Sequence, residues 1–165
     1  MVDWAKSSRD YLNAFDMQVL ATGPGLRQTD CEPGVTAVND AELYARSEIV
    51  TLHADLRPEN RRMIAATQFA SMKPGTVFVN TARGELVDEV ALLAALRSGR
   101  LTGAALDVLC DERSTGMGDH PLVQYARTHE NLLLTPHLGG NTPESAAKTE
   151  RFLAEKLLAF NANAQ

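Results

Sequence analysis

The sequence predicts an α/β fold with a parallel sheet. Short runs of mainly apolar residues, such as 18–22, Thr76–Asn80 and 131–135, lack the strict polar alternation of a strand with one solvated face. Helical segments separate these runs, most clearly at residues 88–98. Strands that are apolar on both faces and alternate with helices favour a parallel sheet covered by helices on both sides.

The first half of the chain predicts three strands. A Gly-Pro-Gly turn at residues 23–25 ends the first strand. Asp40 is expected to cap a short helix, because its carboxylate can accept from the free N–H groups of the first turn. The predicted elements are a helix over 6–15, strands over 18–22, 35–38 and 48–53, and a helix over 41–46.

The second half predicts three further strands. Pro58 suits the first turn of a helix, and Asp88 and Gly99 are typical of the start and end of another. The predicted elements are helices over 57–66, 68–72 and 88–98, strands over Thr76–Asn80, 104–109 and 131–135, and an amphipathic helix over 143–160.

Composition excludes several classes of function. The 165 residues carry a net charge of −5 with acids and bases interleaved, so no basic stripe predicts nucleic-acid binding. No apolar run approaches the roughly 20 residues that cross a bilayer, and residues 1–10 lack the apolar core of a signal peptide. Cys31 and Cys110 belong to no C-x-x-C pair, so neither a metal site nor a disulfide is expected. We expect a soluble, cytoplasmic protein.

Ionisable residues recur at the predicted carboxyl ends of four strands, where parallel sheets place their working residues. The first of these is His53. Arg83 could bind a carboxylate through two hydrogen bonds, or pair with Glu85 or Asp88 on the surface. His137 could exchange a proton near neutral pH, or serve as a structural hydrogen-bonding group.

Two carboxylates complete this set. Glu112 is either a functional carboxylate or a solvated one. Asp107 interrupts an apolar segment, and burying a carboxylate costs several kcal/mol unless it is paired, so we expect a partner or ligand for it. A histidine, a carboxylate and an arginine together suit oxidation of a 2-hydroxy acid by an external hydride acceptor.

Several motifs resemble one family. NTARGELVDE (80–89), GAALDV (103–108) and LLTPHLGGNT (133–142) resemble the C-terminal part of the D-isomer-specific 2-hydroxyacid dehydrogenases, of the phosphoglycerate dehydrogenase and glyoxylate reductase kind. Residues 14–25 and 47–64 also resemble this family, so the resemblance extends from about residue 6 to 158. It implies a Rossmann-like, doubly wound parallel sheet.

The resemblance also implies roles for individual residues. Arg83 would bind the substrate carboxylate and carbonyl, His137 would be the acid/base, and Glu112 would be its partner. Asp107 would meet the nicotinamide carboxamide. The cofactor would be NAD, with NADP as the alternative, and the substrate a small 2-hydroxy or 2-oxo acid; no metal is implied. The implied cofactor-lining residues are Thr81, Ala82, Arg83, Asp107, His137, Leu138, Gly139 and Gly140.

Departures from the family predict an incomplete fold. The last two glycines of the family's G-x-G-x-x-G loop fall on Val2 and Ala5, and the strand before that loop is missing. The acid that holds the ribose falls on Gly23. We therefore expect residues 1–165 to form a single, partial dinucleotide-binding domain without the N-terminal substrate domain, and to bind the cofactor weakly or not at all.

The missing strand would lie between strands 18–22 and 48–53. These two strands would close directly, leave an open edge, or accept a strand from another chain, which makes a homodimer a candidate. Three functions compete: an impaired dehydrogenase, a non-catalytic remnant or interaction module, and a non-redox Rossmann-like enzyme. The third fits poorly, because it does not explain Asp107 together with His137.

Overall fold

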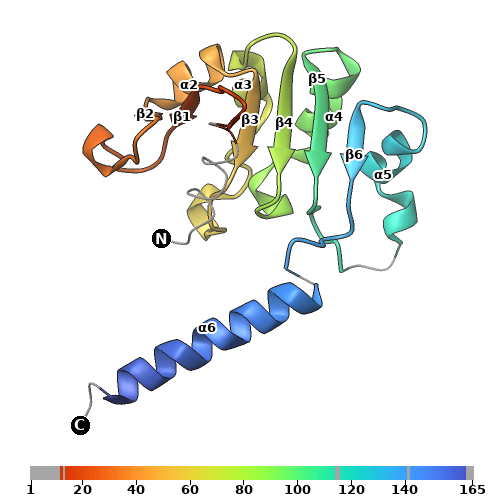
Figure 1. Cartoon of the computed structure of the whole chain (residues 1–165). Helices are drawn as coiled ribbons and strands as arrows, with labels where there is room; N and C mark the ends of the chain where they lie inside the picture. Colours follow the sequence, from red (N-terminus) through yellow and green to blue (C-terminus); the bar gives the residue numbers. More distant parts are fainter. Residues whose placement is uncertain (1–11, 13, 114–115, 141, 163–165) are drawn as a thin grey trace.

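The strands of the chain form two parallel sheets in the computed structural model, which describes residues 12, 14–113, 116–140 and 142–162. Strands β1 (Val19–Ala21) and β2 (Val35–Ala37) pair with each other. A four-stranded sheet has the order β3-β4-β5-β6, with every pair parallel (Figure 1). Its strands are β3 (Ile49–Leu52), β4 (Thr76–Asn80), β5 (Leu101–Leu106) and β6 (Leu132–Leu134). The predicted α/β fold with parallel strands is confirmed.

One face of the four-stranded sheet is buried under helices. Helices α3 (Ala66–Ser71), α4 (Glu89–Arg97) and α5 (Pro121–Ala126) contribute Phe69, Leu92 and Leu122 to a single hydrophobic core. Phe69 meets Phe78 of β4 edge to face, with ring centroids 5.5 Å apart. Helix α2 (Asp40–Arg46) adds Tyr44 to the same core.

The opposite face of this sheet is more open. In β3, Val50 and Leu52 are buried, whereas the alternate residue Ile49 is 48% exposed. In β6, Leu132 is buried and Leu133 is 63% exposed. Among the described residues, the helices that carry the core all contribute to one face of this sheet, and the opposite face carries the more exposed side chains.

Strands β1 and β3 do not pair with each other. They belong to different sheets, so among the described residues the direct closure of the two strands does not occur, and β3 forms an edge of the four-stranded sheet. The family's glycine positions at Val2 and Ala5 lie outside the described residues, as does nearly all of the helix predicted over 6–15.

The helix predicted over 57–66 is wrong. Only a single 3₁₀ turn forms, at Pro58–Asn60, and Arg62 then adopts a φ of +54°. Ile64 makes a parallel bridge to Val87 and is 2% exposed. The burial of Ile64, together with its N–H bond to the carbonyl of Leu86, holds this segment extended against its local helix propensity.

Other predicted boundaries shift. The side chain that caps α2 is Asn39, which accepts from the N–H of Glu42, while Asp40 accepts from the Thr22 hydroxyl. Strand β5 ends at Leu106, three residues before the predicted end, and α3 begins two residues early. Helix α5 was not predicted at all. Strand β4 and helix α4 match, with Asp88 as the cap and Gly99 at a φ of +71°.

Helix α6 (Pro143–Ala162) extends away from the sheets, beyond the edge at which β4, β5 and β6 end (Figure 1). Its described apolar side chains face solvent, including Phe152, Leu157 and Phe160. Within the described part of the chain, no helix is both long and apolar enough to cross a membrane.

Candidate active site

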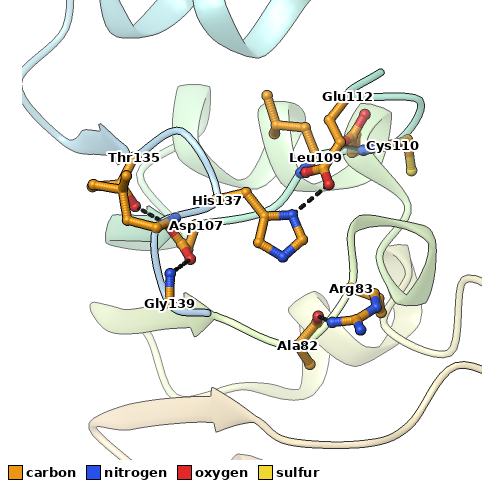
Figure 2. A network of polar contacts seen from close by, with 11 residues as sticks. Ala82, Arg83, Asp107, Leu109, Cys110, Glu112, Thr135, His137 and Gly139 are labelled. Carbon is orange, nitrogen blue, oxygen red and sulfur yellow. Dashed lines mark hydrogen bonds and ion pairs between the residues drawn. The ribbon is translucent and has the colours of Figure 1, made fainter. Parts of the chain in front are cut away.

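The segments that follow β4, β5 and β6 lie close together at one edge of the sheet, because parallel strands end on the same side. The segment after β4 carries Arg83, the one after β5 carries Asp107 and Glu112, and the one after β6 carries His137. Figure 2 shows these side chains in one neighbourhood. Three segments that are distant in sequence thus contribute polar groups to one region.

His137 and Glu112 form a hydrogen-bonded pair between Nδ1 of the ring and Oε1 of the carboxylate. Both side chains are partly exposed, at 37% and 29%. In Figure 2, the nitrogen of His137 that does not face Glu112 points toward the segment carrying Ala82 and Arg83. His137 has a φ of +51°, which is uncommon for a residue other than glycine.

The Glu112 carboxylate is held at both of its oxygens. Its Oε2 accepts from the backbone N–H of Leu109 at 3.3 Å, while Oε1 contacts His137. The loop between these residues turns at Asp111, which has a φ of +52°. Glu112 is therefore not a freely solvated carboxylate but part of a bonded loop.

Asp107 joins the end of β5 to the segment after β6. Its Oδ1 accepts from the Thr135 hydroxyl and from the N–H of Leu138 at 2.9 Å, and Oδ2 accepts from the N–H of Gly139 at 2.9 Å. Burial acts to raise the pKa of this carboxyl, but the three hydrogen bonds and the nearby His137 lower it overall. Asp107 follows β5 rather than interrupting it, which corrects the predicted strand. It has the partner that its sequence context led us to expect.

Arg83 is positioned by the buried side chain of Asn80. Asn80 Nδ2 donates to the carbonyl of Arg83 at 2.9 Å, and its Oδ1 accepts from the N–H of Ala82 at 3.0 Å. The Arg83 guanidinium donates to the carbonyl of Ala82 at 2.6 Å. Among the described residues it forms no ion pair with Glu85 or Asp88, the surface alternative.

Gly84 is required for close packing rather than for a sharp turn. Its φ is not in the left-handed region, but an added Cβ would lie 2.1 Å from the carbonyl carbon of Leu109 and 2.3 Å from the nitrogen of Cys110. The segment after β4 therefore touches the loop that carries Glu112, backbone against backbone.

The other predicted residues surround this cluster. Thr81 is exposed and Ala82 half-buried, Leu138 is 51% exposed, and an added Cβ at Gly140 would meet nothing within 4 Å. Gly139 packs tightly, since a Cβ there would lie 3.2 Å from Asp107 Oδ2. His53 instead bonds the Thr51 hydroxyl on its own segment, and burial lowers its pKa.

A hollow of about 790 Å³ lies beside the carboxyl ends of β1 and β2. Gly23, Asp40 and Glu42 are among its lining residues. An added Cβ at Gly23 would meet nothing within 4 Å, so the glycine leaves room there. Carboxylates at such a position can accept from the hydroxyls of a ribose. The acceptors here suit the hydroxyls of a ribose, and those of Asp107 suit an amide such as that of nicotinamide.

Sequence reasoning did not assign a role to two supporting residues. Asn80 holds the Arg83 segment, and Thr135 helps to hold Asp107. An amide at the end of an otherwise apolar strand was the available signal for Asn80.

The described residues contain no group of three or more His, Cys, Asp or Glu side chains that could hold a metal ion. A carboxylate–imidazole pair beside a guanidinium can transfer a proton on a substrate that also carries an acid group.

Comparisons with known proteins agree with this chemistry. Residues 4–139 match the family model for the NAD binding domain of the D-isomer specific 2-hydroxyacid dehydrogenases. Over 146 residues the chain is 38% identical to a D-3-phosphoglycerate dehydrogenase of Methanocaldococcus jannaschii, covering 87% of this chain and 26% of that protein.

Solved structures show the same fold. An NAD-complexed D-isomer specific 2-hydroxyacid dehydrogenase from Lactobacillus delbrueckii ssp. bulgaricus matches with a TM-score of 0.83 and 27% identity, over 96% of this chain and 51% of that one. An acyclic imino acid reductase in complex with NADPH and D-Arg matches with a TM-score of 0.79 and 29% identity, over 96% of this chain and 48% of that one. The predicted Rossmann-like fold is confirmed, and the chain spans about half or less of these proteins.

Proposed function

The chain belongs to the D-isomer specific 2-hydroxyacid dehydrogenase family through its NAD binding domain, and on this premise we propose that it carries the acid/base and carboxylate-binding groups for interconversion of a 2-hydroxy acid and a 2-oxo acid. The contact between His137 and Glu112 carries this proposal. The activity of the isolated chain is expected to be impaired, because the departures at Val2, Ala5 and Gly23 weaken cofactor binding.

His137 acts as the acid/base. Because its Nδ1 is engaged with Glu112, the proton exchanged with the substrate oxygen moves at Nε2. When the ring takes a proton from a hydroxyl, the Glu112 carboxylate stabilises the positive charge. In the reverse direction, the charged ring returns that proton to the oxygen of the 2-oxo acid.

Arg83 binds the acid group of the substrate. Only one of the five N–H donors of a guanidinium is needed for its bond to the Ala82 carbonyl, so others can pair with a carboxylate. Asn80 fixes the backbone from which Arg83 projects, and this fixes the direction of approach of the acid group.

The cofactor, when bound, supplies the acceptor and donor of hydride. Asp107 would meet its carboxamide: a carboxylate has about four acceptor positions, and three are occupied by bonds within the chain. Thr81, Ala82 and the backbone of residues 138–140 would line it. The hollow beside Gly23 would take the adenosine end, where Asp40 and Glu42 favour NAD over the phosphate-bearing NADP through charge repulsion.

Titration with NADH, followed by nicotinamide fluorescence, tests the cofactor, and 2-oxo acid reduction tests the catalytic residues. Arg83→Ala and His137→Ala should each abolish 2-oxo acid reduction, whereas Arg151→Ala, which changes an exposed ion pair of α6, should leave it unchanged. Unaltered rates in the first two variants would refute the proposed roles. No binding at millimolar NADH would instead favour a non-catalytic interaction module.

We also propose that residues 1–165 act as one dinucleotide-binding domain in the cytoplasm, and that two copies associate. Exposed apolar side chains on the open sheet face and on α6, such as Leu133 and Leu157, support association. Sedimentation of the purified chain over a range of concentrations distinguishes monomer from dimer.

A further inference from the structure

A second carboxylate–histidine pair lies beside the candidate site. Glu89, the first residue of α4, contacts Nε2 of His120 through Oε2 at 3.1 Å. Both side chains are 16% exposed, so this pair is more buried than that of His137 and Glu112. The mechanism above gives it no role.

The hydrogen bonds of His120 indicate which of its two ring nitrogens carries a proton. Its Nδ1 accepts from the backbone N–H of Leu122 at 3.3 Å, which caps the start of α5. Since this nitrogen accepts, the ring proton lies on Nε2 and is donated to Glu89. His120 thus connects the first turns of α4 and α5.

The other oxygen of Glu89 binds the loop that carries Glu112. Oε1 accepts from the backbone N–H of Cys110 at 2.8 Å. The preceding amide, that of Leu109, donates to Glu112 itself. Two successive amides of this loop therefore donate to two different carboxylates, and the orientation of the first amide depends on that of the second.

Close backbone packing restricts the same loop from another side. A Cβ on Gly84 would lie 2.1 Å from Leu109 and 2.3 Å from Cys110, so the loop has no room to shift toward the segment that carries Gly84. The half-buried Cys110 side chain adds a neutral group to this packing: desolvation, followed by the charges of Glu89, Glu85 and Asp111, raises the pKa of its thiol to about 12. The loop is thus confined between Gly84 and Glu89.

We propose that Glu89, oriented by His120, is a positioning residue that holds the 109–112 loop so that Glu112 meets His137. This proposal rests on the proposed function only in giving the contact between Glu112 and His137 a catalytic use. The contact itself exists in the chain without cofactor or substrate. Glu89 touches neither group of the catalytic pair and acts through the Cys110 amide.

Backbone amide hydrogen exchange of the full chain tests this proposal. In Glu89→Ala, the Leu109 amide should exchange faster by about tenfold or more, although its own acceptor Glu112 remains, because the loop has lost a charge-assisted bond. Asp88→Ala is the matched control: it removes the cap of the same helix, the bond to the Ala91 amide, without touching the loop. In that variant the exchange rate of the Leu109 amide should change only as much as the exchange rate of the Leu106 amide in β5.

If exchange in Glu89→Ala increases at Cys110 alone, or equally at Leu109 and Leu106, the positioning role is refuted. Should that variant not fold, Glu89→Leu decides the matter, because leucine has an apolar side chain of similar size but cannot accept from the Cys110 amide. Faster exchange at Leu109 with Leu106 unchanged then supports the role, and unchanged exchange at Leu109 overturns it.

The proton on Nδ1 of His137 gives a second readout, through its hydrogen-bonded NMR resonance. This resonance should weaken or shift in Glu89→Ala and should persist in Asp88→Ala. An unchanged resonance in both variants would count against the proposal. Because this experiment requires no cofactor, unaltered 2-oxo acid reduction in Arg83→Ala and His137→Ala would refute the proposed function while leaving the positioning role intact.

Discussion

At the scale of single residues, backbone amides hold the candidate site in place as much as side chains do. The N–H groups of Leu138 and Gly139 bind Asp107, and the N–H of Leu109 binds Glu112. These bonds offset the positive φ of His137, a conformation that costs on the order of 1–3 kcal/mol in a non-glycine residue. The segment after β6 therefore depends on the charge state of Asp107.

Acid should weaken this connection. The folded chain lowers the pKa of Asp107, so the carboxylate contributes stability above its unfolded pKa, and the contribution is lost as pH falls through the folded value. We predict that urea-unfolding free energy declines below about pH 4 with a shallower slope in Asp107→Asn than in the wild type. At pH 7 this variant should lose about 1 kcal/mol, because its amide nitrogen cannot accept the Gly139 bond.

Asp55→Asn is the control for this measurement. The exposed Arg57 beside Asp55 lowers the pKa of that carboxyl, but water screens such a surface pair, so the slope should change little. Identical slopes for the wild type and Asp107→Asn would contradict the structural role of Asp107.

At the scale of elements, each strand of the larger sheet has one buried and one more open face. Neighbouring leucines of β6 differ most clearly: Leu132 is 4% exposed and lies in the core, whereas Leu133 is 63% exposed. Both leucines lie in the same strand, and the pleat of the backbone places their side chains on opposite faces of the sheet. The pair therefore reports directly on which face the helices cover.

Substitution of these two leucines should have unequal effects. Leu132→Ala is expected to cost about 2–5 kcal/mol of unfolding free energy, because it leaves a cavity among buried neighbours. Leu133→Ala should change that free energy by no more than about 0.5–1 kcal/mol. Urea unfolding of both variants checks the difference. Similar large losses would mean that the open face is covered in solution, as association of two copies would produce.

At the scale of the whole molecule, α6 is separate from the packed α/β unit. Its described side chains contribute none of the core residues, and Phe152, Leu157 and Phe160 are 57%, 62% and 72% exposed. The packed unit is thus complete without α6 among the described residues. A helix that buries so little gains its stability mainly from its own hydrogen bonds and side-chain pairs, such as Arg151 with Glu155.

Removal of residues 143–165 should therefore reduce the helical circular dichroism signal while changing the unfolding free energy of the remainder by less than about 1 kcal/mol. Urea unfolding monitored at Tyr44 and Tyr125, both buried in the core, checks this expectation. A loss of several kcal/mol would show instead that α6 packs against the sheets or against a second copy.

The sequence by itself determined the class of fold, most of the strands and the identity of the candidate site. Apolar runs such as Thr76–Asn80 and the cap at Asp88 act within a few residues, so local patterns are sufficient to predict them. Tertiary structure decided what depends on distant partners: the extended segment at Ile64, which a bridge to Val87 holds against helix propensity, the face that the helices leave open, and the end of β5 before Asp107. The bonds that hold Glu112, His137 and Asp107 in place join residues 3 to 32 positions apart. Contacts across the longer of these separations form only when the strands align, which is why the bond from Cys110 to Glu89 emerges from the folded chain alone.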